Sequence, residues 1–307
     1  MALNVTYGAS TWLWVSPFTT KLADELFEKI ARIGFNVVEI AVDDPSLIDV
    51  KEIRNALAVH GLKASICGAF GPSRDLTNNS SDIQQNGLDY IESCLDICAG
   101  LGAGFLGGPM YAAVGKARML PTAERKKEWE LAVKNLQKVC AMAAARDLKI
   151  ALEPLNRFES DLVNTTEDVV RLVKDIDHPA AQIMLDSFHM SIEEKNIENA
   201  ILAAGDKLIH LQVAENYRGA PGSGQTDWPS YRSALEQINY EGIITIESFT
   251  TDNVELAGAV CFWNPKAESQ DVFATEGLQF LKKWAAEKKK VSQNGKLKPQ
   301  FNNGKKS

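Results

Sequence analysis

The sequence predicts a single (β/α)8 barrel of the TIM type, and three observations lead to this fold class. The 307-residue chain is 45% hydrophobic and 24% charged, which suits one globular unit of a fold that typically takes about 250 residues. Strand-like and helix-like segments alternate along the whole chain. The strand-like segments are apolar at nearly every position, as in parallel strands that are covered on both faces. An open doubly wound sheet is the alternative, which the absence of G-x-G-x-x-G after the first strand disfavours.

Eight segments have the length and composition of buried strands. They are short apolar runs, and most are bounded by glycine, proline or polar residues. These segments are residues 5–10, 37–42, 63–70, 105–110, 150–155, 182–187, 208–215 and 242–248.

Apolar residues at helical spacing predict the helices between these strands. The first helix has apolar residues from Leu22 to Ile33 and stops at Gly34. Thr165 and Asp168 form an [ST]-x-x-[DE] pattern, which is typical of a helix start. Further helices are expected over residues 49–60, 82–99, 123–146, 197–204, 229–237 and 275–290.

The composition divides the chain into a barrel over residues 1–290 and a basic, polar tail over residues 291–307. Residues 287–307 contain seven Lys and one Glu, a net charge of +6. Because the whole chain has a net charge of −7, residues 1–286 carry −13. We interpret the tail as a flexible, solvated end, and packing on a neighbouring subunit is the alternative.

Bulk properties exclude several classes of protein. A net charge of −7 argues against a nucleic-acid binder, which needs a basic face. No apolar run approaches the roughly 18 residues needed to span a membrane, and the N-terminus lacks a signal-peptide pattern. We therefore expect a cytoplasmic protein without a membrane partner. The five cysteines have no C-x-x-C spacing, which favours reduced, structural thiols.

Oxygen-bearing side chains stand at or near the ends of the last four predicted strands. Glu153, Asp186, Gln212 and Glu247 follow one another at intervals of 33, 26 and 35 residues. TIM-barrel active sites are built at the C-terminal ends of the strands, so these side chains are expected to converge. Buried carboxylates need a compensating cation, and oxygen ligands suit Mn²⁺ or Mg²⁺, while Co²⁺ also fits. We predict a divalent metal, with Mn²⁺ preferred, and no organic cofactor.

Two histidines and an arginine lie close to these residues in the sequence. His189 comes three residues after Asp186, and His210 shares a strand face with Gln212 two residues later. His210 would either support Gln212 or fill the barrel interior. Arg218 lies in a glycine-rich loop that lacks the Lys-Ser/Thr pair of a nucleotide phosphate loop.

Aromatic residues gather at or just beyond the predicted strand ends, and the apolar C–H faces of a sugar would suit such walls. We predict that Trp14 and Phe249 contact a small-molecule sugar substrate. The stretch F-W-N-P at residues 262–265 would either cap this pocket or form a subunit interface. The other aromatic residues near strand ends are Trp12, Phe70 and Tyr111.

At these residues the chain resembles the D-tagatose 3-epimerase (ketose 3-epimerase) family of xylose-isomerase-like barrels. The resemblance extends over roughly residues 7–284. Its motifs are G-G-P-M-Y-A-A-V-G (107–115), E-P-L-N-R-F-E (153–159), L-D-S-F-H (185–189), A-E-N-Y-R (214–218) and I-E-S-F (246–249).

The resemblance implies a role for each matching residue. Glu153 and Glu247 look like the two metal-bound catalytic glutamates and Asp186 like a metal ligand. The residues that would hold the substrate oxygens near C1 and C2 are Glu159, His189 and Arg218. The family normally has a metal-binding histidine at the position of Gln212, and H-x-Q-x-A is more similar to the hydroxypyruvate isomerases of the same superfamily. Family members commonly form dimers or tetramers, so a homodimer or homotetramer is expected.

The predicted activity is metal-dependent epimerisation at C3 of a free ketose. The metal would act as a Lewis acid. One glutamate would remove the C3 proton to give an enediolate, and the other would return a proton to the opposite face. Alternatives are a sugar or hydroxypyruvate-type isomerase, which Gln212 favours, a lyase acting on keto-glycosides, and an inactive sugar-binding module. A metal-dependent phosphodiesterase or abasic-site nuclease is disfavoured because the chain has only four histidines.

Overall fold

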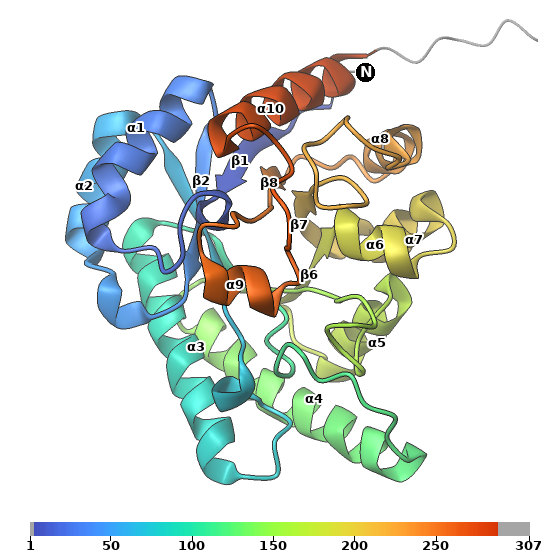
Figure 1. The fold of residues 1–307 in the computed structure, drawn as a ribbon. Helices are drawn as coiled ribbons and strands as arrows, with labels where there is room; N and C mark the ends of the chain where they lie inside the picture. Colours follow the sequence, from blue (N-terminus) through green and yellow to red (C-terminus); the bar gives the residue numbers. More distant parts are fainter. Residues whose placement is uncertain (1–2, 288–307) are drawn as a thin grey trace, which may run out of the picture.

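The chain folds into a closed barrel of eight parallel strands surrounded by helices (Figure 1). This computed structural model describes residues 3–287. Each strand pairs with the next one in sequence, and β8 closes the barrel against β1, so the predicted TIM barrel is confirmed. The strands are β1 (Thr6–Ser10), β2 (Val37–Val42), β3 (Lys63–Gly68), β4 (Phe105–Gly108), β5 (Lys149–Leu152), β6 (Ala181–Asp186), β7 (Leu208–Val213) and β8 (Ile243–Ile246).

Helices cover the outside of the barrel and part of its opening. None of those in the described part of the chain combines the length and the apolar character that crossing a membrane requires. The helices are α1 (Ala23–Ile33), α2 (Val50–His60), α3 (Ser81–Leu101), α4 (Thr122–Ala144), α5 (Thr166–Ile176), α6 (Ser187–Glu193), α7 (Ile197–Ala204), α8 (Trp228–Gln237), α9 (Val254–Ala259) and α10 (Gln270–Ala286).

Burial on both faces explains the composition of the strands. All six residues of β2 are buried, because the barrel interior covers one face of the strand and the helices cover the other. Helix α1 buries Leu26, Phe27 and Ile30 toward the barrel and exposes its charged face. It ends at Gly34, whose φ of 107° lies in the left-handed region that favours glycine.

The barrel interior is filled by side chains in layers. Phe105, Ala151 and Met184 form one buried cluster that is separate from the main core. Gly107 lies against this layer, and a Cβ atom at its position would stand only 2.8 Å from the sulfur of Met184. A side chain at residue 107 would therefore collide with the filled interior. Successive inward positions on a strand are two residues apart. Glu153 and Asp186, two residues after Ala151 and Met184, therefore lie one layer closer to the barrel mouth.

The structure differs from the predicted elements at several places. Helices α6 and α9 were not predicted, and α10 begins at Gln270, five residues before the predicted start. Helix α6 follows β6 without a loop, because the Asp186 carboxylate accepts a hydrogen bond from the Phe188 N–H at 2.7 Å and caps the helix. The predicted tail over residues 291–307 and the end of the last predicted helix lie outside the described residues.

The predicted helix start at Thr165 is a capping box. The Thr165 hydroxyl accepts from the Asp168 N–H at 3.1 Å, and the Asp168 carboxylate accepts from the Thr165 N–H at 3.2 Å. This pair fixes the end of the loop that connects β5 to α5 and carries several polar residues of the barrel mouth.

We therefore expect Thr165→Ala to lower the free energy of unfolding by about 1 kcal/mol, because the Asp168 N–H loses its acceptor and the Asp168 carboxylate loses the Thr165 hydroxyl. Thr165→Ser is the matched control, since it keeps the hydroxyl and should stay within a few tenths of a kcal/mol of the parent. Urea unfolding monitored by circular dichroism would measure both values. Equal losses in the two variants would argue against the capping role.

Candidate active site

The four oxygen-bearing residues predicted at the strand ends lie together at the C-terminal end of the barrel. Glu153 directly follows β5, Asp186 ends β6, Gln212 lies within β7 and Glu247 directly follows β8. The strand register sets Asp186 beside Gln212, and Gln212 beside Thr245, two residues before Glu247. All four side chains are buried. Their convergence follows from the parallel barrel, in which the carboxyl ends of all strands meet at one end.

Arg218 joins two of these carboxylates. Its Nη1 donates to Asp186 Oδ2 at 2.6 Å and to Glu247 Oε2 at 2.8 Å. The guanidinium also lies over the rings of Phe188 and Phe249, at 4.2 and 5.1 Å from the centroids. The backbone of Arg218 has a φ of 61°, which is uncommon for a residue with a side chain. Its carbonyl accepts from the Ser248 hydroxyl at 2.8 Å, a bond that helps hold this conformation.

The site carries an excess of buried negative charge. Burial raises the pKa of Glu153 well above its usual value, and the nearby Glu247 and Asp186 raise it further. Burial also raises the pKa of Glu247 to about 8, against the opposing effect of Arg218. When ionised, these three carboxylates and one guanidinium leave a formal charge of −2. A divalent cation would balance it.

The donor set fits a hard divalent metal. Gln212 Nε2 donates to Glu39 Oε1 at 2.7 Å and to Glu247 Oε1 at 3.0 Å. Its carbonyl oxygen is buried and has no hydrogen-bond partner among residues 3–287. A buried amide oxygen without a donor is available to a cation. Glu153, Asp186 and Gln212, together with Glu247, could therefore hold Mn²⁺ or Mg²⁺.

His189 presents its Nε2 atom to the same space. Its Nδ1 accepts from the Asn156 N–H at 3.1 Å, and Arg218 Nη2 lies 3.3 Å from its Nε2, so a hydrogen-bond donor faces each ring nitrogen. Burial lowers the pKa of His189, which favours the neutral form. The Nε2 atom lies 3.7 Å from Glu153 Oε1 and 3.8 Å from Asp186 Oδ2. The Asn156 side chain also donates to Glu159 Oε1 at 2.7 Å and so links these two predicted substrate-binding residues.

A cavity of about 410 Å³ opens above these residues. This volume suits a small ligand such as a sugar. Glu153, Glu159, His189, Arg218 and Glu247 supply polar groups to its lining. Helix α9, orange in Figure 1, lies across the front of the barrel opening and contributes an apolar wall. The apolar and aromatic lining residues include Trp12, Phe70, Leu155, Phe249, Leu256 and Val260.

Two aromatic residues near strand ends do not line this cavity. The structure places Trp14 outside the lining, where its indole N–H donates to Asp271 of α10 at 2.8 Å. A 3-10 turn over Thr11–Leu13 faces Trp12 toward the cavity and turns Trp14 away, so Trp12 takes the place predicted for Trp14. Tyr111 is buried in the core, and its hydroxyl donates to the Val163 carbonyl at 3.2 Å.

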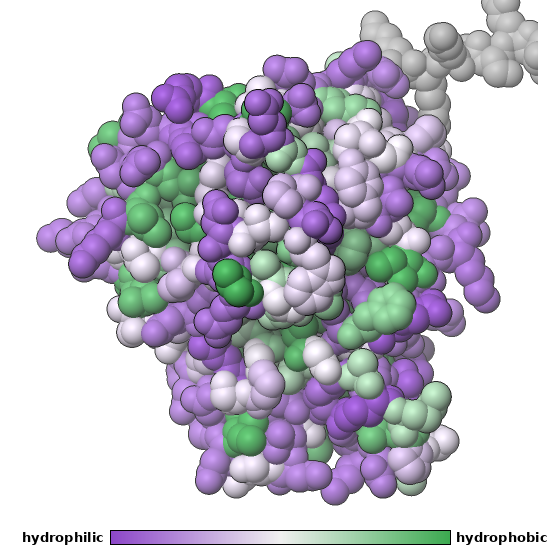
Figure 2. Space-filling view, viewed as in Figure 1, coloured by the Kyte–Doolittle hydropathy of each residue, from purple (hydrophilic) through white to green (hydrophobic). Residues whose placement is uncertain are grey.

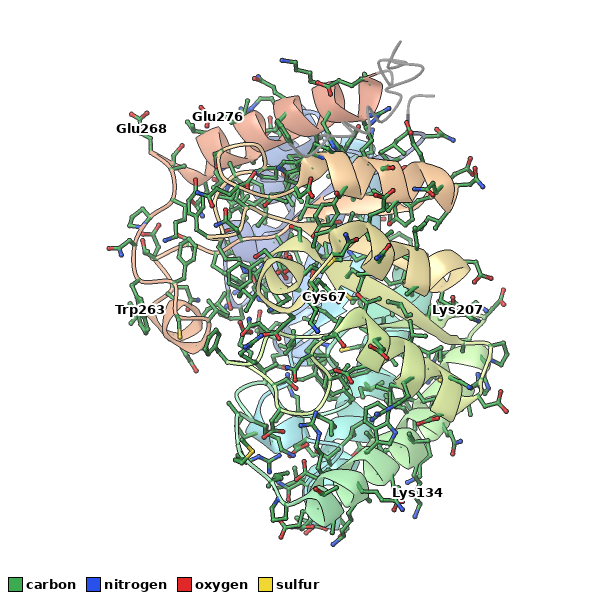
Figure 3. All side chains as sticks on the ribbon, turned by 90° about the vertical axis from the view of Figure 1, so that its right-hand side faces the viewer. Cys67, Lys134, Lys207, Trp263, Glu268 and Glu276 are labelled. Carbon is green, nitrogen blue, oxygen red and sulfur yellow. The ribbon has the colours of Figure 1, made fainter. Side chains whose placement is uncertain are left out.

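The stretch at residues 262–265 is divided between core and surface. Phe262 packs edge-on against Phe249 with ring centroids 6.1 Å apart, so it supports the cavity wall from behind. Trp263 is 68% exposed. Figure 3 shows Trp263 at the edge of the molecule near α9, whereas Cys67 lies near the centre of the barrel. Seen from the barrel opening, the surface is mostly hydrophilic with scattered apolar spots (Figure 2).

Sequence reasoning missed three polar residues in and around the site. Glu39 is buried inside the barrel, Asp43 lines the cavity, and Asn156 orients His189. The sequence could have indicated Glu39, because a carboxylate in the middle of the apolar strand V-V-E-I-A-V is costly to bury without a partner. That partner is His210, whose Nε2 lies 2.6 Å from Glu39 Oε2. His210 therefore belongs to the polar network below the site.

Known proteins of the same architecture are similar to this chain over most of its length. Residues 27–284 match the xylose isomerase-like TIM barrel family. The chain is 31% identical over 278 residues to the L-ribulose 3-epimerase of Methylomonas sp. (strain DH-1), which covers 90% of this chain and 96% of that enzyme. It is 32% identical over 247 residues to the D-psicose 3-epimerase of Ruminiclostridium cellulolyticum, which covers 80% and 84%.

Solved structures have the same fold as this chain. The crystal structure of a Methylomonas D-allulose 3-epimerase in complex with D-allulose matches with a TM-score of 0.86 and 29% identity, covering 92% of this chain and 99% of that one. The resemblance to ketose 3-epimerases that the motifs indicated is confirmed.

The raised pKa of Glu247 predicts how the stability of the metal-stripped protein depends on pH. An unfolded glutamate titrates near pH 4.3, whereas Glu247 in the folded protein titrates near 8. The folded protein therefore loses stability as the pH rises from about 4.3 to about 8. In chelator, Glu247→Gln should reduce this loss by a few °C in Tm, and Glu255→Gln, on the exposed surface of α9, should not. Thermal unfolding across this pH range would test this, and a Glu247→Gln profile parallel to the parent's would contradict it.

Proposed function

Because the chain belongs to the xylose isomerase-like TIM barrel family, we propose that it is a divalent-metal-dependent epimerase acting at C3 of a free ketose. It is an enzyme of the isomerase class, like its epimerase relatives. One observation carries the proposal: Glu153 and Glu247 reach the same cavity from β5 and β8. Both have raised pKa values, and such carboxyl groups can act as acid and as base near neutral pH.

The metal is proposed to be Mn²⁺, held by Glu153, Asp186, Gln212 and Glu247. When bound, such a cation acts as a Lewis acid that polarises a substrate carbonyl and acidifies the neighbouring C–H bond. The all-oxygen donor set supports a hard metal. The buried Gln212 carbonyl oxygen, which has no hydrogen-bond partner among the described residues, supports its inclusion among the ligands.

The two glutamates perform the proton transfers. One takes the C3 proton, and the other delivers a proton to the opposite face of C3, which inverts that centre. Each glutamate alternates between base and acid in the two directions of the reaction. His189 polarises the substrate oxygen O2, a role supported by its place in the cavity lining, with Nε2 beside Glu153 and Asp186.

Binding residues orient the ketose between these groups. Glu159 and Arg218 hold the oxygens near C1 and C2, and the rings of Trp12 and Phe249 pack against the apolar faces of the sugar. The protein is further proposed to assemble as a homodimer or homotetramer, in keeping with its resemblance to the ketose 3-epimerases.

Proton NMR in D₂O tests the reaction directly. The metal-stripped protein, with and without Mn²⁺, is given D-fructose, D-psicose, D-tagatose, L-ribulose and hydroxypyruvate. We expect deuterium at C3 and formation of the epimer only with Mn²⁺.

Glu153→Gln and Glu247→Gln should each slow exchange by about 10²- to 10⁴-fold, because each removes a proton-transfer group. Exchange at C1, or turnover of hydroxypyruvate alone, would identify an isomerase instead. No exchange with any of these would exclude a free ketose, and keto-glycosides would be tried next.

The cavity walls predict a difference between two tryptophans. Trp12→Ala should raise KM by about 10-fold with a smaller change in kcat, because the ring contacts bound sugar in the ground state and the transition state alike. Trp14→Ala is the matched control, since this ring bonds Asp271 instead of lining the cavity. Its KM should stay within about twofold of the parent. Steady-state kinetics would measure both, and a larger KM effect for Trp14 would show that the wall is assigned to the wrong residue.

A further inference from the structure

Glu39 is a buried carboxylate below the proposed metal site. It comes from the middle of β2, is 1% exposed, and reaches across the barrel interior to β7. Oε1 accepts from Gln212 Nε2 at 2.7 Å, and Oε2 lies 2.6 Å from His210 Nε2. Both carboxylate oxygens therefore contact residues of a strand on the far side of the barrel.

The amide of Gln212 has two different ends, and only one can bind a cation. The nitrogen faces two carboxylates, Glu39 at 2.7 Å and Glu247 at 3.0 Å, and the carbonyl oxygen faces away from these acceptors. Turning the amide by 180° would remove both hydrogen bonds and set its oxygen against the carboxyl oxygens of Glu39 and Glu247. It would also present N–H protons to a cation, and an amide N–H is a donor that cannot act as a ligand.

We propose that Glu39 is a positioning residue that fixes which end of Gln212 faces the metal. This inference rests on the metal site proposed above. Glu247 alone does not fix the amide in the same way, because its other oxygen is engaged by Arg218 at 2.8 Å and the residue itself would bind the metal. Glu39, by contrast, has both oxygens engaged by residues of β7, Gln212 and His210. It thereby allows a glutamine to serve as a metal ligand.

A double-mutant cycle on metal affinity tests the proposal. Binding of Mn²⁺ to the metal-stripped protein is followed by the EPR signal of the free ion. Glu39→Ala should weaken binding by about 10- to 100-fold, the usual effect of losing a residue that orients a metal ligand. In the Gln212→Ala background, where no amide remains to be oriented, the same substitution should change affinity by less than about twofold. Glu39→Gln retains a carbonyl acceptor for Gln212 and should weaken binding less than Glu39→Ala.

Ser65→Ala is the matched control. Ser65 neighbours Glu39 in the β2–β3 register, and its buried hydroxyl has no hydrogen-bond partner among the described residues, so Mn²⁺ affinity should not change. Thermal unfolding in chelator separates folding from binding, because a merely structural role would lower Tm without altering the affinity of the folded protein. Mn²⁺ affinity unchanged in Glu39→Ala, or weakened equally in both Gln212 backgrounds, would overturn the proposal. Failure of the parent protein to bind Mn²⁺ would instead overturn the metal site itself.

Discussion

The crowding of buried carboxylates at one end of the barrel is the constraint on which the rest of the site depends. Glu153, Asp186 and Glu247 are all removed from water. Burial raises the pKa of Glu153 and of Glu247, and neighbouring carboxylates raise both further. Arg218 compensates part of this charge. The barrel makes the arrangement possible because eight paired strands hold the side chains in place against their mutual repulsion.

The loop after β7 is built to deliver the compensating guanidinium. Its buried Glu215 accepts hydrogen bonds from the Gly222 N–H, the Thr226 N–H and the Trp228 indole, and so closes the loop on itself. Within this frame the left-handed backbone at Arg218 is tolerated, since surrounding hydrogen bonds offset its cost. A strained residue held at the centre of a charged cavity is consistent with function rather than with stability of the fold.

The barrel and the ends of its strands could be predicted from the sequence, but the contacts that cross the barrel interior could not. Apolar runs ending in acids located Glu153, Asp186 and Glu247, because the fold alone brings strand ends together. Trp14 was misplaced because one 3-10 turn decides which tryptophan faces the cavity, and no periodicity records that turn. The role of Glu39 depends on partners more than 170 positions away in the chain, a distance over which local patterns carry no information.

In the proposed metal site, the glutamine at position 212 would supply an amide oxygen. It is a neutral oxygen donor, so with three carboxylates the set consists only of hard oxygen atoms. Such a set favours Mn²⁺ and Mg²⁺ over metals that prefer imidazole nitrogen. An amide ligand, unlike a carboxylate, must also be oriented, and the Gln212 amide donates to a buried acceptor on β2, the Glu39 carboxylate. The amide of Gln212 and the carboxylate of Glu39 are thus best understood together, as two parts of the proposed metal site.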